Sequence, residues 1–283
     1  MANVFLGWPN RVGESTLSGG SWLAALPRAN VADARITKVA RSSTDAVADT
    51  KIIGDMGQSR SVRAFALVNH NLSQSALVRF RLGTTSGGAE VYDSGWVNAW
   101  QMSFDTDLLE WEDAGWWEGI TDDEYLRAPF AVVHVISEFK SARYWSIEVD
   151  DTTNADTYVQ IGRVFVGGGL LPAKNISYGS LDGWEDPSSI VRSESGAEYA
   201  VVLPKLRVTR FRLDWLTPAE SEYVHEMLRR LGTTGEVLYV PDANDADAQQ
   251  RYGFLGRLRE LSAIEYPYVS TRAIALEIAE ILS

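Results

Sequence analysis

The chain has 283 residues, of which 45% are apolar and 23% charged, and it carries a formal net charge of −12 without a single cysteine. This length favours two domains, and the composition argues against wholesale disorder. The lack of cysteine excludes disulfide bonds, thiol catalysis and cysteine-based zinc sites. The acidic balance argues against nucleic acid and anionic membrane surfaces as partners, because both attract clustered lysine and arginine.

The first residues lack the basic and apolar segments of a secretory signal. No segment approaches the roughly 18 apolar residues that a membrane span requires. We therefore expect a protein that is made soluble in the cytoplasm and does not insert into a membrane.

The first half of the chain is rich in strand patterns. Residues 1–60 indicate short strands and turns, with one alternating segment at residues 34–40. Stronger patterns follow, separated by Gly and Asx turns, and no long helix is indicated. Many short strands joined by such turns predict an antiparallel sandwich. The expected strands are residues 61–68, 76–82, 89–94, 130–136, 142–149 and 158–166.

A tryptophan-rich acidic stretch interrupts these strands. Between Asp105 and Glu124 lie nine carboxylates and no lysine or arginine. Indole rings among carboxylates are typical of a sugar site, which includes the option of a glycosidase acid and base. They are also typical of a packing surface or a protein interface, which we favour because aromatic side chains surrounded by polar ones characterise interfaces. The candidate ligand or interface residues are Trp96, Trp100, Trp111, Trp116 and Trp117.

The glycines at residues 167–169 predict a domain boundary, because three glycines in a row order poorly. We expect a first domain at residues 1–168, an extended connector with a few short strands at 169–205, and a second domain at 206–283.

The second domain has a different pattern. A strand at residues 206–215 precedes Thr217-Pro218-Ala219-Glu220, which predicts a capping box, and the following helix ends at Gly232. A strand at 236–240, an acidic loop at 242–250 and strands at 251–261 and 271–281 follow. The last segment also fits a helix, but a strand closes the sheet better. The fold class is therefore mostly β, an antiparallel sandwich followed by a smaller α+β domain in which β-sheets pack with one helix.

No motif indicates catalysis. His70, His134 and His225 have no partners at metal-ligand spacing, and the chain lacks the nucleophile elbow and the nucleotide-binding glycine loops. We expect no metal, no cofactor and no enzymatic activity, with the three histidines in structural roles.

Residues 30–168 resemble the galactose-binding-like, discoidin-type jelly roll. The resemblance rests on the segment from Phe65 to Leu72, on Leu77 to Arg81, on Ala142 to Val149, and on Ile161 to Gly167. It implies a jelly-roll form of the sandwich. It implies no particular ligand, because the binding loops of that family vary freely.

The whole layout also resembles structural proteins of tailed-bacteriophage virions. The segments from Arg210 to Glu220, from Val237 to Asp242 and from Gly253 to Gly256 are similar to ring-forming tail domains. The resemblance implies a tail-tip or baseplate subunit, located in the virion, with copies of itself and other tail proteins as partners. The alternative is a carbohydrate-binding module that contacts host-surface glycans, and a glycan-degrading enzyme is a third, less favoured, hypothesis. In the usual distal-tail arrangement the ring domain comes first, whereas here it comes last, so the position within the tail stays open.

Overall fold

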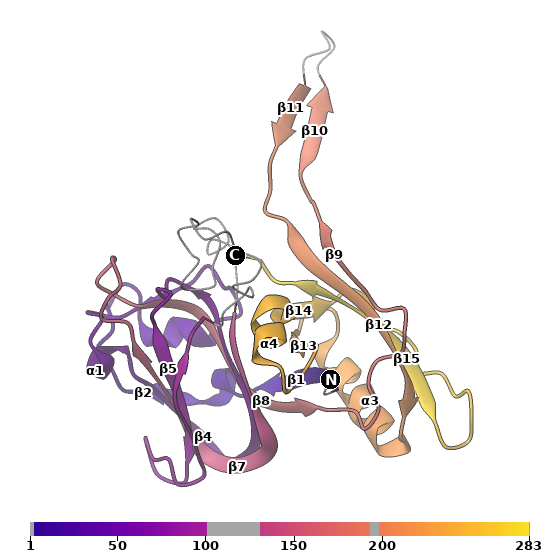
Figure 1. Ribbon diagram of the computed structural model, residues 1–283, viewed down its shortest axis with the longest axis horizontal. Coiled ribbons are helices and arrows are strands. Elements are labelled where there is room, and N and C mark those ends of the chain that lie inside the picture. Colours follow the sequence, from indigo (N-terminus) through magenta and orange to yellow (C-terminus); the bar gives the residue numbers. More distant parts are fainter. Residues whose placement is uncertain (1–2, 101–130, 193–197, 283) are drawn as a thin grey trace, which may run out of the picture. The chain divides into compact units, whose positions relative to one another are not determined.

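The computed structural model describes residues 3–100, 131–192 and 198–282, which divide into two compact units (Figure 1). Unit 1 comprises Met1–Leu171 and Leu238–Phe254, and unit 2 comprises Pro172–Val237 and Leu255–Leu282. The chain therefore leaves unit 1, returns to it for one short segment, and leaves it again.

Unit 1 is built from antiparallel strands, in the order β6-β5-β7-β4-β8-β1-β13, with β2 on β4 and β3 on β8. Its helices are short. The strands are β1 (Phe5–Asn10), β2 (Thr16–Ser18), β3 (Ala40–Arg41), β4 (Ile52–His70), β5 (Leu77–Gly83), β6 (Tyr92–Asn98), β7 (Val132–Asp150), β8 (Gln160–Leu170) and β13 (Glu236–Val240). The helices are η1 (Val12–Glu14), η2 (Arg28–Ala32), α1 (Val47–Thr50) and α4 (Ala246–Tyr252).

Two long strands, β4 and β7, join the two layers of the sandwich. They pair along their whole length, but the register shifts twice. At one end β7 also pairs with β5, and at the other end β4 also pairs with β8. The core lies between these ends, where Phe65 of β4 stacks on Phe80 of β5 with ring centroids 4.9 Å apart. The expected antiparallel sandwich is confirmed.

Trp145 is the largest fully buried side chain of this core. It stands opposite Gly54 on the neighbouring strand, and a Cβ at Gly54 would lie 2.1 Å from the indole. Only glycine leaves room for the ring there. The indole Nε1 donates to the Ser15 hydroxyl over 3.1 Å, which satisfies its polar atom inside the core.

The three glycines at residues 167–169, which were predicted to mark a domain boundary, lie inside strand β8, and the chain leaves unit 1 shortly after them, at Leu171. The backbone of β1 approaches them closely. A Cβ would lie 2.2 Å from the Pro9 carbonyl oxygen at Gly167 and 2.4 Å from the Leu6 carbonyl oxygen at Gly169. Glycine at these positions serves close strand packing.

Unit 2 contains the antiparallel strand order β14-β15-β12-β9, a separate hairpin β10-β11 and the helix α3. The strands are β9 (Leu181–Glu185), β10 (Ser189–Arg192), β11 (Glu198–Val201), β12 (Leu206–Leu216), β14 (Phe254–Leu258) and β15 (Arg272–Glu280). The helix is α3 (Pro218–Leu231). The final segment is thus the expected strand, because alternate side chains of β15 are buried.

The helix α3 begins as expected. The Thr217 side chain accepts from the Glu220 backbone N–H, and the Glu220 carboxylate accepts from the Thr217 N–H over 2.7 Å, which completes the capping box. Gly232 follows the last helical residue. The helix buries Val224, Met227 and other residues of its apolar stripe, although Ala219 is exposed.

A buried ion pair joins the strands β12 and β15 of unit 2. Arg207 of β12 and Glu280 of β15 are at most 9% exposed, and the guanidinium Nε donates to the Glu280 carboxylate over 2.9 Å. A buried pair of this kind is costly to break, because one charge would remain uncompensated.

Several expected elements differ from the observed ones. The alternating segment 34–40 forms bends and turns up to Val39, and Ile36 is its single buried side chain before Ala40. The expected loop 242–250 contains most of α4, which Asp245 caps by accepting from the backbone of Asp247 and Ala248. This helix also takes the first residues of the strand expected at 251–261.

Candidate functional site

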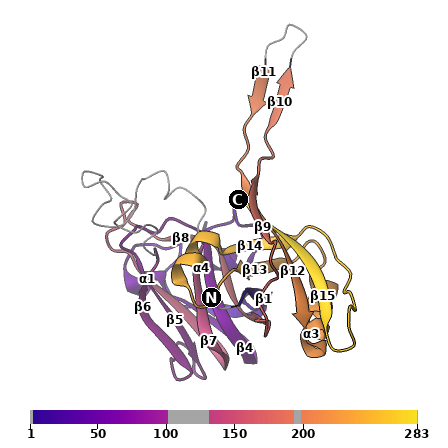
Figure 2. The same ribbon diagram turned by 45° about the vertical axis from the view of Figure 1, so that its right-hand side comes forward.

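The hairpin formed by β10 and β11 extends beyond the end of the β9-β12 ladder (Figures 1 and 2). We call the described residues on either side of its tip, 187–192 and 198–204, the arm. In this hairpin Ile190 pairs with Ala200 and Val191 pairs with Tyr199. Every described residue of the two strands is exposed.

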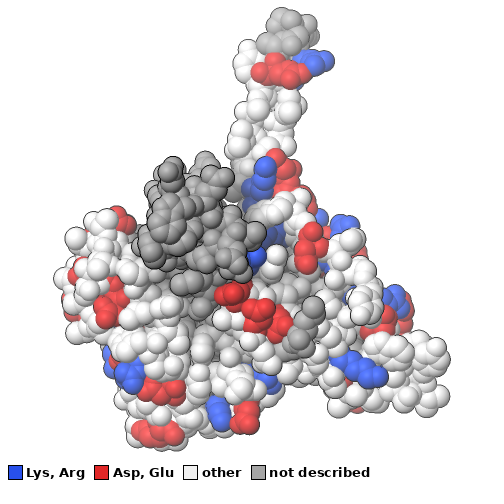
Figure 3. All heavy atoms as spheres, in the orientation of Figure 1, with Lys and Arg blue, Asp and Glu red and all other residues white. Residues whose placement is uncertain are grey.

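Both faces of the arm carry apolar side chains. Paired residues share a face and alternate along each strand. One face therefore carries Ile190 and Ala200, and the other carries Val191, Tyr199 and Val201. Val202 and Leu203 follow the last residue of β11. The large members are between 45% and 81% exposed. The arm is uncharged along most of its length and appears white there in Figure 3.

Polar groups fix the arm at both ends. Near the tip the Arg192 guanidinium pairs with Glu198 across the hairpin. At the base the Ser188 hydroxyl accepts from the Leu203 N–H over 2.9 Å. Ser188 also donates to Asp186, through its side chain and its backbone N–H, and these bonds lower the pKa of that carboxyl.

A shallow groove of about 410 Å³ runs along the β9-β12 ladder at the base of the arm. Its apolar side chains include Leu181, Trp184 and Val208, and Leu181 and Trp184 are more than 60% exposed. Carboxylates of β9 and the guanidinium of Arg210 line the groove as well. Exposed apolar side chains are thus present on this ladder as well as on the arm.

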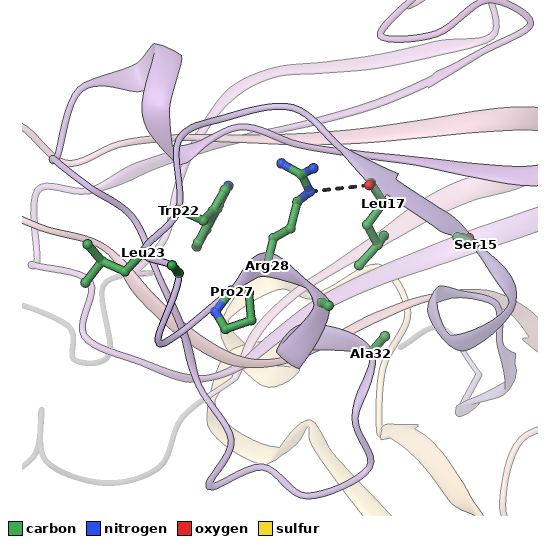
Figure 4. Close-up of a pocket in the computed structure, with 9 residues that line it drawn as sticks. Ser15, Leu17, Trp22, Leu23, Pro27, Arg28 and Ala32 are labelled. Atoms are coloured by element: carbon green, nitrogen blue, oxygen red, sulfur yellow. Dashed lines mark hydrogen bonds between the residues drawn. The ribbon is translucent and has the colours of Figure 1, made fainter.

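A second concave site lies within unit 1, and its volume is about 490 Å³. Trp22, Arg28 and Leu17 stand side by side around it (Figure 4). The Arg28 guanidinium donates to the carbonyl oxygens of Leu17 and Gly19 over 3.3 and 3.0 Å, through Nε and Nη1. The Trp22 indole donates to the Lys51 carbonyl oxygen over 3.4 Å. An indole face beside a guanidinium is a surface on which a sugar ring can stack.

The structure describes two of the five candidate tryptophans. Trp96 of β6 is 40% exposed, with the Arg79 guanidinium 6.0 Å from its ring centroid. Trp100 packs against the core of unit 1, and its indole donates to the Leu72 carbonyl oxygen over 3.2 Å. Trp111, Trp116 and Trp117 lie outside the described residues. Their assignment to a ligand site or an interface stays a prediction.

The arm lies within residues 169–205, for which the sequence predicted an extended connector with a few short strands and no exposed hairpin. A signal was present. Two short runs with β-branched and aromatic residues, 189–192 and 198–202, flank the sequence Ser-Glu-Ser-Gly-Ala at residues 193–197, which is rich in turn-forming residues. Such a pattern predicts a hairpin, but nothing local shows that both of its faces stay uncovered.

Within residues 3–100, 131–192 and 198–282, no group of three or more His, Asp or Glu residues is placed to hold a metal ion. In the same described part of the chain, no helix is long and apolar enough to cross a membrane.

No protein-family model matches the chain, and no curated protein sequence matches it. Several solved structures show partial similarity. The lectin domain of lectinolysin complexed with Lewis b antigen has 15% identity and a TM-score of 0.38, covering 58% of this chain and 99% of that one. The family 32 carbohydrate-binding module of NanJ from C. perfringens, in complex with galactose, has 10% identity and a TM-score of 0.36, with coverages of 58% and 98%.

A chitosan-binding module from a chitosanase/glucanase of Paenibacillus sp. IK-5 is similar at 14% identity, with a TM-score of 0.37 and coverages of 57% and 100%. Similarity at this level carries no conclusion about what this chain binds or does.

Proposed function

We propose that this chain is a structural subunit of a larger protein assembly, and that this assembly is a bacteriophage tail. The observation that carries the first part is the apolar arm of unit 2. The assignment to a tail tip or baseplate, and so to the virion, rests on the resemblance of the sequence to virion proteins.

The arm is costly to leave in water. A two-stranded hairpin is marginally stable by itself, and large exposed apolar patches mark interaction surfaces. Its six large apolar side chains would contribute on the order of 10 kcal/mol in total if a partner covered them. This stabilisation is comparable with the roughly 4 to 15 kcal/mol of translational and rotational freedom that two proteins lose when they associate. The arm therefore suits a contact in an assembly where further surfaces add to it. Its six large apolar side chains are Ile190, Val191, Tyr199, Val201, Val202 and Leu203.

The experiment is immunogold labelling of virions with antibodies against the purified chain, together with negative-stain microscopy of the chain itself. Labelling at one end of the tail supports the proposal. Virions that carry neither label nor peptides of this chain in mass spectrometry contradict the tail assignment. A chain that also forms no complex with itself or with tail proteins contradicts the structural role as a whole.

A second candidate function is carbohydrate binding, which the Trp22–Arg28 site favours. Its indole face, guanidinium and concave shape supply the contacts that a sugar ring requires. A glycan array with the wild-type chain and with Trp22→Ala tests it. A glycan signal that disappears in the variant while the melting temperature is retained supports this function. An array without any specific signal counts against it.

A further inference from the structure

Of the nine described residues that line the concave site of unit 1, Arg28 alone carries a charge. The other polar side-chain groups of this lining already have partners. The Ser15 hydroxyl donates to a main-chain carbonyl oxygen over 2.8 Å and accepts from the Trp145 indole over 3.1 Å. The Trp22 indole donates to the Lys51 carbonyl oxygen. The Arg28 guanidinium is therefore the polar group of this lining that can bind a ligand most strongly.

The Arg28 guanidinium is fixed in place and still has donors to offer. Its Nε and Nη1 atoms donate to the carbonyl oxygens of Leu17 and Gly19. These bonds use two of the five N–H groups of a guanidinium, so one remains on Nη1 and two remain on Nη2. Within the part of the chain that the structure describes, no Asp or Glu forms an ion pair with Arg28. Its charge is thus not matched by a carboxylate of the described residues.

Two glycines shape the loop that carries the site. Gly19 and Gly20 have φ values of +84° and +62°, in the left-handed region that favours glycine. A Cβ at Gly20 would lie 2.4 Å from the Lys51 carbonyl oxygen and 2.6 Å from the Trp22 Nε1 atom. The close approach of this backbone positions the indole, and the Gly19 carbonyl oxygen positions the guanidinium. A site fixed in this way loses little conformational entropy on binding.

The chemistry of this lining favours a carboxylate over a neutral group. A guanidinium donates and cannot accept, and its planar fork matches the two oxygens of a carboxylate. Hydrogen bonds between two charged groups are roughly twice as strong as neutral ones. The nine lining residues include no carboxylate and no side-chain amide, so the hydroxyls of a neutral sugar find neither of these acceptors there.

We propose that the concave site binds a ring that carries a carboxylate. The ring lies against the Trp22 indole and the carboxylate binds the Arg28 guanidinium, which stand side by side in Figure 4. The volume of about 490 Å³ is within the usual range of small-ligand sites. This inference goes beyond the carbohydrate binding considered above, because it names the charged group and applies to a sugar acid and to an aromatic acid alike.

The first experiment compares acids with their neutral amides on the wild-type chain, by ligand-observed NMR titration at neutral pH. The pairs are galacturonate with galacturonamide, for the sugar acid, and benzoate with benzamide, for the aromatic acid. Each amide has nearly the shape of its acid but no charge. We expect at least one acid to bind, about 10-fold or more tightly than its own amide, because charged hydrogen bonds replace neutral ones.

The second experiment locates the binding with variants. Arg28→Met removes the donors and keeps the apolar stem, and Trp22→Ala removes the indole. The control is Arg257→Met, an exposed position on β14 of unit 2 that gives the same net charge as Arg28→Met. We expect Arg28→Met to lose the preference for the acid and the control to keep it. Melting temperatures show whether each variant is folded, and the comparison of acid and amide on the wild type depends on no variant.

Three outcomes overturn the inference. They are a wild type that binds neither acid, an acid and amide that bind equally well, and a folded Arg28→Met variant with the wild-type affinity for the acid. If galactose binds through Trp22 and the acids bind no better, the inference fails and carbohydrate binding stands. If benzoate binds through Arg28 and no sugar binds, the inference stands and carbohydrate binding fails. If no ring binds, both fail.

Discussion

Neighbouring tryptophans in unit 1 have different surroundings. Trp96 is exposed on β6 beside Arg79, whereas Trp100 packs on the core and satisfies its indole N–H at Leu72. A count of tryptophans cannot distinguish these two situations. The distinction depends on strands that are distant in sequence, because Leu72 precedes β5 and Trp100 follows β6.

We expect Trp100→Ala to lower the free energy of unfolding by about 2 to 3 kcal/mol, since a packed indole leaves a cavity. Trp96→Ala should cost about 0.5 kcal/mol or less, as is usual for exposed positions. Urea denaturation of both variants measures the difference, and each serves as the control for the other. Equal losses would show that Trp96 supports the core as much as Trp100 does.

His134 is the histidine whose surroundings have the clearest consequence. Its ring stacks on Phe80 with centroids 5.2 Å apart, and Nε2 lies 2.7 Å from the Tyr92 hydroxyl. Burial disfavours the charged imidazolium and lowers the pKa of His134 to about 4. The expected structural role of this histidine is consistent with these contacts.

The lowered pKa of His134 predicts a pH dependence of stability. The unfolded chain binds a proton near pH 6.5, whereas the folded chain does so near pH 4. The contribution is therefore fully present above pH 6.5 and is lost as the pH falls towards 4, by roughly 3 kcal/mol in total. His134→Phe keeps the stacking but cannot titrate. The difference in unfolding free energy between the wild type and the variant should change by that amount between pH 7 and pH 4, because the carboxylates are common to both. A constant difference would contradict the assignment.

At the scale of elements, local chemistry predicted α3 and β15 well. Thr217, Pro218 and Glu220 act within one helical turn, so the sequence contains the whole signal of the capping box. The arm, α4 and the bends at residues 34–39 were missed for different reasons. Asp245 is a capping residue within an acidic run that was interpreted as loop. Ala34 to Val39 alternate like a strand but have no pairing partner.

The lengths of strands β4 and β7 were also not predictable from the sequence pattern. The sequence predicted strands at 130–136 and 142–149, whereas the structure joins them in one strand, Val132–Asp150. Continuity across the intervening residues comes from pairing with β4, which bends with shifts of register. Pairing between distant segments cannot be derived from the pattern of either one.

The capping box gives a prediction at this scale. Thr217→Ala removes the side chain that accepts from the Glu220 N–H, and we expect a loss of about 1 kcal/mol in unfolding free energy. Thr217→Ser keeps a hydroxyl and should restore most of it. Thermal denaturation of both variants measures the effect. An alanine variant as stable as the serine variant would mean that packing alone fixes the start of α3.

At the scale of the whole molecule, the segment Leu238–Phe254 belongs to unit 1, although the sequence assigned it to the second domain. Residues 238–240 of β13 pair with β1, where Leu6 stands opposite Tyr239, and they belong to unit 1. The predicted limit at residue 168 leaves this strand out. Pattern analysis could not find it, because a short apolar strand at 236–240 suits either sheet equally well.

This arrangement predicts how fragments of the chain behave. A fragment of residues 1–171 lacks β13 and α4, so the edge of β1 and the apolar side chains against it meet water. Leu238, Tyr239, Val240 and Phe254 are at most 2% exposed in the whole chain, and losing their burial costs on the order of 5 kcal/mol or more. In a second fragment, residues 236–254 are attached to residue 171 through a flexible glycine–serine linker, which restores the missing strand and helix.

We expect the linked fragment to melt cooperatively at a temperature roughly 10 to 20 °C above that of the short fragment. The short fragment should aggregate through its open strand edge. Calorimetry and light scattering of the two fragments test this expectation. Equal melting temperatures would show that β1 and its neighbours form a stable sandwich without β13, and would favour the boundary that the sequence predicts.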